Sequence, residues 1–131
     1  MLRTYSKNIA VTANTPIVFN INKILTNNSV SHSAGSGNIV VNAPGYYAVN
    51  LDLSGTIATT GEAIIQLYAD GTAIPDALIK KTFTASESSD TSFSTIIKAT
   101  PGITGKTVTL TVLSNVDLTL SDIALGMNRL A

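Results

Sequence analysis

Residues 44–55 read PGYYAVNLDLSG, and this stretch decides the fold. Its large apolar side chains recur at every second position: Tyr47, Val49, Leu51 and Leu53 fall on one face of an extended chain. A period of two residues is that of a β-strand with one buried face, whereas a helix repeats every 3.6 residues. The stretch therefore predicts a half-buried strand that begins after a Pro-Gly turn.

The same alternation continues along the chain. Residues 107–112 read TVTLTV, with the apolar residues on one face and the threonines on the other. Strong helix formers are scarce, and no segment shows a helical repeat of apolar residues. We predict an all-β jelly-roll sandwich of eight to ten antiparallel strands. Residues 15–131 form its single domain, and residues 1–14 form an N-terminal arm or a first strand. The expected strands after residue 14 are 17–19, 38–41, 46–57, 63–69, 74–84, 91–100, 107–114 and 118–130.

The last expected strand changes face partway along its length. Its apolar residues stand at even positions at first, in Leu118 and Leu120, and at odd positions later, in Ile123 and Leu125. A shift of one residue moves every side chain to the other face of a sheet, so an extra residue is needed. We expect a bulge or bend near residues 121–122.

Glycine, proline and aspartate mark the connections between strands. Asp70-Gly71 is the strongest two-residue hairpin signal, because both residues tolerate a positive φ. A polar loop is expected over residues 26–37, where many short polar residues follow one another. The residues assigned to structural turns are Pro44, Gly45, Asp70, Gly71, Pro101 and Gly102.

The composition excludes many classes of function. The chain has 131 residues, of which 12% are charged, and its formal net charge is zero. Nucleic-acid binding is driven by clustered basic residues, and no such cluster is present, so we expect neither a nucleic-acid partner nor a membrane partner. The chain has no Cys and one His, so we expect no metal site and no cofactor. With 18 Thr and 13 Ser, its surface is coated with hydroxyls, which suits a protein held in an assembly.

No residue pattern identifies a catalytic site. His32 lies among serines in the expected polar loop, where a solvated loop histidine is the better interpretation than a catalyst. No Gly-x-Ser-x-Gly nucleophile motif is present, and Glu87 and Asp90 are the only carboxylates close together in sequence. A pair of carboxylates can cleave a glycoside only when a cleft holds them at a set distance. We therefore expect no catalytic residue and no enzyme.

The tyrosines divide between the core and the surface. Tyr47 is in phase with the apolar face of residues 44–55, so we expect it in the core. Tyr46 and Tyr68 do not share that phase, and we take them as candidates for a trimer interface or a ligand contact, together with Glu87 and Asp90.

The order of segments resembles that of a known superfamily. Residues 44–49, PGYYAV, are similar to the Gly-x-Tyr strand of the jelly rolls related to tumour necrosis factor and to the complement globular head. Residues 65–71, IQLYADG, resemble the hairpin of that superfamily, and residues 94–99 with 105–110 resemble its next pair of strands. Residues 124–130, ALGMNRL, are similar to the closing strand of its bacterial and phage members. Lys106 stands where that superfamily usually has an acid, which argues against a calcium site.

This resemblance implies a compact homotrimer used for structure or recognition. Among its members, a non-enzymatic virion protein, a capsid decoration or head-fibre protein of a bacteriophage, fits a chain with no collagen stalk and no secretion signal. The expected partner is then the major capsid protein or another virion protein, and the expected location is the virion, after synthesis in the cytoplasm of a bacterial host. The alternative is a receptor- or carbohydrate-binding tip domain of a tail fibre or of an exosporium-like bacterial surface protein, which has a host-surface glycan as its partner.

Overall fold

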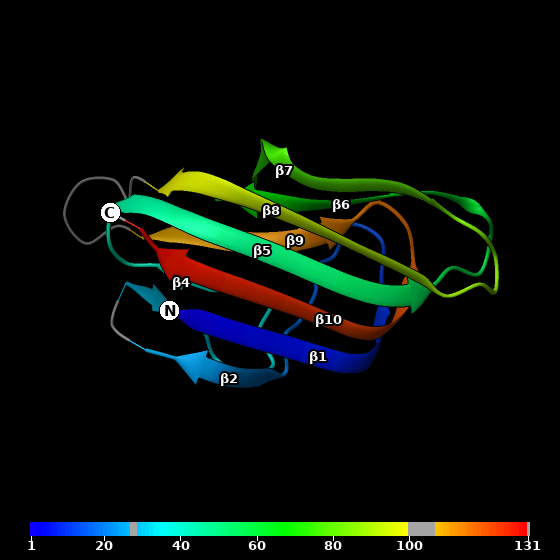
Figure 1. Ribbon diagram of the computed structural model, residues 1–131, viewed down its shortest axis with the longest axis horizontal. Helices are drawn as coiled ribbons and strands as arrows, with labels where there is room; N and C mark the ends of the chain where they lie inside the picture. Colours follow the sequence, from blue (N-terminus) through cyan, green and yellow to red (C-terminus); the bar gives the residue numbers. More distant parts are fainter. Residues whose placement is uncertain (27–28, 100–106, 131) are drawn as a thin grey trace.

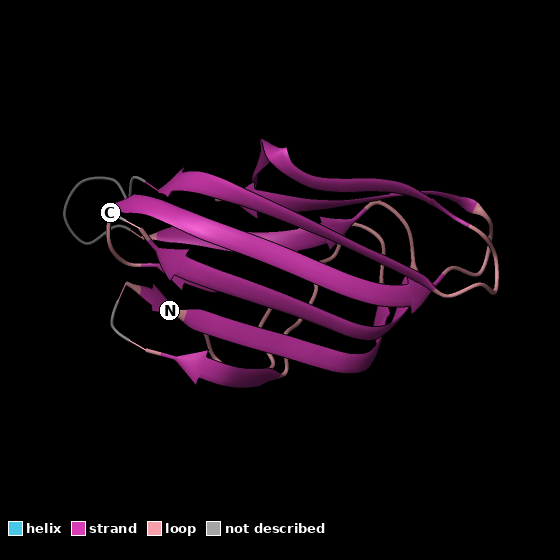
Figure 2. Ribbon diagram, in the orientation of Figure 1, coloured by secondary structure: helices cyan, strands magenta, loops and turns pink. Residues whose placement is uncertain are grey.

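The computed structural model describes residues 1–26, 29–99 and 107–130. Within these ranges the chain forms ten β-strands in two five-stranded sheets and no α-helix (Figures 1 and 2). It follows that the described part contains no helix able to cross a membrane. The strands are β1 (Leu2–Val11), β2 (Ile21–Leu25), β3 (Val30–Ser31), β4 (Ile39–Val41), β5 (Gly45–Thr56), β6 (Gly61–Ala69), β7 (Thr72–Phe83), β8 (Ser89–Ala99), β9 (Val108–Ser114) and β10 (Leu118–Arg129).

The two sheets stack face to face. The front sheet, nearer the viewer in Figure 1, has the order β2-β1-β10-β5-β8, and the back sheet has the order β3-β4-β9-β6-β7. Every pairing is antiparallel, and the chain passes repeatedly from one sheet to the other between consecutive strands. This arrangement is a jelly roll, as the alternation of apolar residues predicted.

The core lies between the two sheets. Alternate side chains of β5 are buried, and Tyr47, Val49 and Leu51 are each at most 1% exposed. The prediction that Tyr47 belongs to the core is confirmed, and its hydroxyl donates a hydrogen bond of 2.7 Å to the backbone oxygen of Ala43. A buried phenol needs such a partner, because an unpaired hydroxyl in the core costs about 1–3 kcal/mol.

The predicted change of face in the last strand is a β-bulge. Leu120 lies opposite Gly55 of β5, whereas Asp122 lies opposite Ser54, so Ser121 is the extra residue. A Cβ atom on Gly55 would lie 2.5 Å from the backbone oxygen of Thr119. The bulge thus brings the two backbones together at Gly55, where only glycine fits.

Residues 2–11 form β1, which lies between β2 and β10 in the front sheet. Two of its inward side chains are polar but hydrogen-bonded. The hydroxyl of Thr4 donates to the backbone oxygen of Ile21 at 2.9 Å, and that of Ser6 donates to the backbone oxygen of Val18 at 2.8 Å. These bonds fasten the segment that leads into β2 against β1.

The expectation for residues 17–37 is partly wrong. A strand was expected at 17–19, but only a single bridge, Phe19 to Ser36, forms there. Ile17 and Phe19 are buried, and the amide of Ile17 bonds to the backbone oxygen of Val112 in β9, but these isolated bonds do not extend into a ladder. Strand β2 instead follows at Ile21–Leu25, and the short strand β3 lies inside the expected polar loop. Residues 17–19 alternate between buried and exposed positions because two of their side chains pack into the core. A buried connecting segment and a buried strand give the same pattern, so the pattern does not distinguish them.

Candidate functional site

The outward face of the front sheet carries an unusual set of side chains. Six of the seven large apolar residues that are exposed within the described ranges belong to its strands or adjoin them directly. Single exposed apolar residues are ordinary, whereas a gathering on one face marks an interaction site. The six are Met1, Ile21, Leu25, Tyr46, Ile96 and Leu130. Leu25 lies opposite the buried Leu2 and so does not belong to the outward face.

Four of these residues form an apolar end of the front face, defined by Met1, Tyr46, Ile96 and Leu130. The amide of Leu130 bonds to the backbone oxygen of Tyr46 at 2.7 Å, which places the two residues opposite each other. On β8, Ile96 pairs with Ala48, two positions beyond Tyr46 on the same face of β5. Ile96 is 60% exposed and Tyr46 48% exposed. Both described ends of the chain lie at this end of the sheet (Figure 1).

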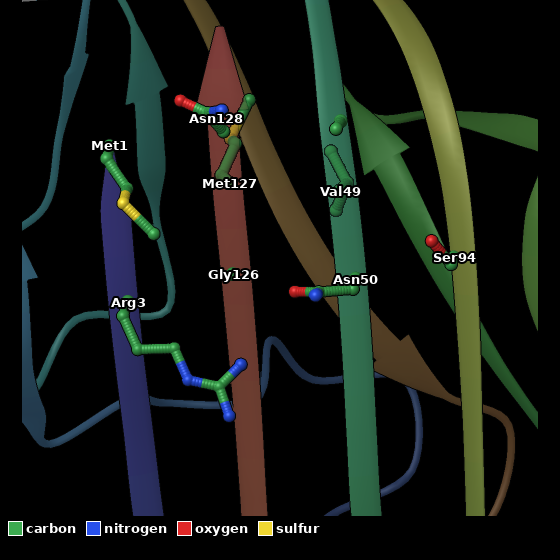
Figure 3. Close-up of a pocket in the computed structure, with 9 residues that line it drawn as sticks. Met1, Arg3, Val49, Asn50, Ser94, Gly126, Met127 and Asn128 are labelled. Carbon is green, nitrogen blue, oxygen red and sulfur yellow. The ribbon is translucent and has the colours of Figure 1, made fainter.

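A hollow of about 150 Å³ lies beside the apolar end, over β10 and β5. The surface is hollowed here because Gly126 and Ala48, two of the lining residues, have little or no side chain. Figure 3 shows Arg3 of β1 and Asn50 of β5 extending over β10 toward Gly126. The hollow has both apolar and polar walls, so its shape and chemistry suit a protruding side chain from a partner surface.

Farther from the apolar end, the front face is charged. A second hollow, of about 450 Å³, is lined by Arg3, Lys7, Lys23, Asp52 and Asp122, among other residues. Arg3 Nη2 lies 4.0 Å from Asp52 Oδ2, and both side chains are substantially exposed. An exposed pair at this distance contributes little to stability, so these charges remain open to a partner.

The structure places the four predicted contact residues in three separate regions. Tyr46 and Asp90 share the front face but lie opposite Lys98 and Ser54, far apart along β5 and β8. Tyr68 is half-buried on the outward face of the back sheet, opposite Thr111 of β9 and Ala73 of β7. Glu87 is exposed in the loop before β8. The four residues therefore do not form one site.

Asp90 belongs to the charged part of the front face. Its carboxylate accepts a hydrogen bond from the hydroxyl of Ser54, and its backbone oxygen accepts one from Lys81 Nζ at 2.8 Å. In the register of the sheet, Asp122 of β10, Ser54 and Asp90 lie in one row. No group of three or more metal-ligating side chains occurs in the ranges that the structure covers.

The residues assigned to turns can be placed only in part. Asp70 and Gly71 have φ values of 49° and 82° and join β6 to β7, as a two-residue hairpin requires. Pro44 precedes Gly45 at the start of β5, and its backbone oxygen accepts a hydrogen bond of 2.7 Å from Arg129 Nη2. Pro101 and Gly102 lie outside the described residues.

His32 is buried, so the expectation of a solvated loop histidine is wrong. It is only 6% exposed and packs edge-on against Phe19. Its ring nitrogen Nδ1 lies 2.6 Å from Oδ1 of Asn22, and Nε2 lies 2.8 Å from the backbone oxygen of Ser36. The Asn22 amide nitrogen donates to the backbone oxygen of His32, which turns Asn22 Oδ1 toward the ring. The ring of His32 thus links β2 to the turn at residues 33–36.

Replacing His32 by alanine is expected to lower the free energy of unfolding by about 2 to 3 kcal/mol. The change removes the polar contacts of the ring with Asn22 and Ser36 and opens a cavity beside Phe19. Urea denaturation measures the loss. Ser33→Ala, at an exposed neighbour, is the control and should change stability by less than about 0.5 kcal/mol. Equal stability of the two variants would contradict this role of His32.

Comparison with known proteins shows the fold. No protein-family model matches the sequence, and no curated protein is significantly similar to it. The globular domain of zebrafish complement 1qA protein matches with a TM-score of 0.77 at 12% identity, covering 99% of this chain and 96% of that chain. The PRD1 vertex protein P5 matches with a TM-score of 0.67 at 10% identity, again covering 99% and 96%.

A third solved structure agrees with these two. Murine APRIL matches with a TM-score of 0.62 at 11% identity, covering 95% of this chain and 96% of that chain. The segments that carry the resemblance in the sequence lie between residues 44 and 130, whereas the structural match covers nearly the whole chain. In fold, the chain is a jelly roll of the type found in the complement globular head and in tumour-necrosis-factor-like proteins, a type that includes a phage vertex protein.

Proposed function

We propose that the chain is a non-enzymatic, homotrimeric structural protein of a virion, a capsid decoration or head-fibre protein of a bacteriophage. The front face is its trimer interface, and the apolar end is the part of that interface that most needs a partner. The observation that carries the proposal is the gathering of Met1, Tyr46, Ile96 and Leu130 on one face of a jelly roll.

The apolar end needs a partner for a simple energetic reason. Removing a large apolar side chain from water is worth roughly 1.5–3 kcal/mol, and four such side chains lie close together here. A second copy of the chain supplies the same apolar groups in a closed ring, so that self-association buries all of them. The low content of charged residues fits this arrangement, because a surface covered by partners does not need charge to remain soluble.

The virion assignment is supported by fold. The PRD1 vertex protein P5 shares the jelly roll over 99% of this chain, and the sequence resemblance points to the phage branch. The decoration or head-fibre role also requires a partner on the particle, which we take to be the major capsid protein or another virion protein. Such a role uses contacts between surfaces and no chemistry at a catalytic centre.

The mass in solution tests the trimer. The chain has a mass of 13.6 kDa, so size-exclusion chromatography with light scattering at micromolar concentration should give about 41 kDa. A clean monomer at 13.6 kDa would contradict the proposal. The virion role is tested separately by mass spectrometry of purified particles of the host's phage, in which the chain should be present in a fixed ratio to the major capsid protein.

A second candidate function is recognition of a host-surface glycan or receptor by the tip of a fibre. The observation that favours it is the position of Tyr68 on the outward face of the back sheet. That face stays open in a trimer that buries the front face, and a tyrosine ring there can stack against a sugar ring. Binding of the native trimer to a glycan array would favour this function over decoration of the head, and an array without binding would count against it.

A further inference from the structure

Basic and acidic residues are distributed unevenly along the sequence. No carboxylate precedes Asp52, and the first 51 residues contain three basic residues, Arg3, Lys7 and Lys23. The fold places all three on β1 and β2, which lie side by side at one side of the front sheet. We call these three residues the cationic side of the front face.

The acidic residues of the front face lie on the other strands. Asp122 is on β10, Asp52 is on β5 and Asp90 is on β8, and the register of the sheet places them in two neighbouring rows. We call these three residues the anionic side. Lys98 also points to the front, but it lies at the apolar end, opposite Tyr46.

Within one chain the two sides meet where β1 pairs with β10, because Lys7 lies opposite Asp122 in the register. Lys81 Nζ also bonds to the backbone oxygen of Asp90, but few of these charges form an ion pair. The described part of the structure contains two ion pairs, and only one of them, Arg3 with Asp52 at 4.0 Å, belongs to the front face. Lys23 and Asp90 take part in neither. Burying such groups against an apolar partner would cost several kcal/mol, because each would lose its water without gaining an opposite charge.

A closed ring of three copies offers these groups a partner. Each interface in such a ring is heterologous, which means that one part of a subunit meets a different part of the next subunit. We propose that the cationic side of one copy contacts the anionic side of the next copy, so that opposite charges set the register of the ring. This inference rests on the homotrimer of the proposed function and adds the code by which the copies recognise one another.

Charge complementarity then has two roles. It steers two copies into the productive orientation, and it disfavours the alternative in which two like sides meet. The apolar end stabilises the contact between two copies but does not fix their relative orientation, since its side chains pack with any apolar surface. The charged sides select one arrangement from those that bury the apolar end.

Charge reversal tests the proposal. The first variant carries Arg3→Glu, Lys7→Glu and Lys23→Glu, and the second carries Asp52→Lys, Asp90→Lys and Asp122→Lys. Each reverses one side only, so like charges meet at every interface. In each variant the concentration at which half the chains are trimeric should rise at least about 100-fold relative to the native chain, as measured by light scattering.

A third variant carries all six substitutions and restores opposite charges at every interface. It should again form a trimer, but it should not exchange subunits with the native chain, which native mass spectrometry of a mixture detects. The matched control reverses the pair on the back sheet, Lys80→Glu with Glu62→Lys, and should remain trimeric. Circular dichroism establishes that each variant is folded.

The outcomes separate the two proposals. A monomeric native chain would overturn the trimer itself. A trimeric native chain whose two one-sided variants are also trimeric would overturn only the charge code. The six-substitution variant also tests the charge code. If this variant is folded but does not form a trimer, opposite charges at the interface are not sufficient to restore assembly, and the charge code is overturned. If a one-sided variant does not fold, the salt dependence of the native trimer provides the test instead. Raising the salt concentration about tenfold, to about 0.5 M, should raise the half-assembly concentration about 10-fold, because salt screens the charges. An unchanged half-assembly concentration would overturn the charge code.

Discussion

Gly55→Ala is expected to lower the free energy of unfolding by about 3 kcal/mol or more. The added Cβ atom would lie 2.5 Å from the backbone oxygen of Thr119 and 2.7 Å from Cδ2 of Leu120. Forcing an extra carbon into a filled site commonly costs about 1–3 kcal/mol, and the cost is larger where the obstacle is backbone. Here the two central strands β5 and β10 would have to separate at their bulge.

Urea denaturation and calorimetry check this expectation. For a domain of this size, a loss of 3 kcal/mol lowers the melting temperature by roughly 10 °C. The matched control is Gly61→Ala at the start of β6, where the nearest atom to the new Cβ is 3.8 Å away. That substitution should stay within about 1 kcal/mol of the native chain. If the two variants unfold at the same urea concentration, the bulge does not require glycine.

Ile96→Glu is expected to dissociate the proposed trimer while leaving each subunit folded. Ile96 is the most exposed of the large apolar residues in the described ranges, and it stands on β8 at the apolar end. Losing its burial removes roughly 1.5–3 kcal/mol from each of three interfaces, and the carboxylate that replaces it must also lose water. The half-assembly concentration should rise at least about 100-fold.

Light scattering across a dilution series measures that change, and thermal unfolding of the monomer measures the fold. Val18→Glu is the matched control, because Val18 is also an exposed apolar residue but does not lie on a strand of the front sheet. It should leave the trimer intact. A trimeric Ile96→Glu variant would place the interface elsewhere on the molecule.

The alternation of apolar residues was sufficient to predict most of the fold. It predicted the face of β5 that is buried, and it located the bulge in β10 from the shift between Leu120 and Ile123. It did not predict β2 and β3, because their positions depend on contacts with residues distant in sequence. The backbone oxygen of Val18, for example, is held by Ser6, and no local pattern encodes that bond.

The sequence predicted that some side chains of the front face are exposed, but it did not predict the face as a whole. Tyr46 was separated from the core by its phase, but Ile96 carries no signal of exposure, because it adjoins Ile97 in an apolar run. Only the register of β8 against β5 shows that Ile96 points outward beside Tyr46. His32 was misjudged although a signal existed: Val30, Ser31 and His32 alternate buried, exposed, buried, as in a strand.

The position of β1 also dictates when this chain can fold. β1, at Leu2–Val11, has β10, at Leu118–Arg129, as its main neighbour, so the first strand made pairs with the last one. At about 5–20 residues per second, β1 waits on the order of 10 s during translation before its partner exists. Pairing over such a separation is intrinsically slow. The front sheet therefore cannot be completed until β10 has been made, and until then β1 lacks its main neighbour.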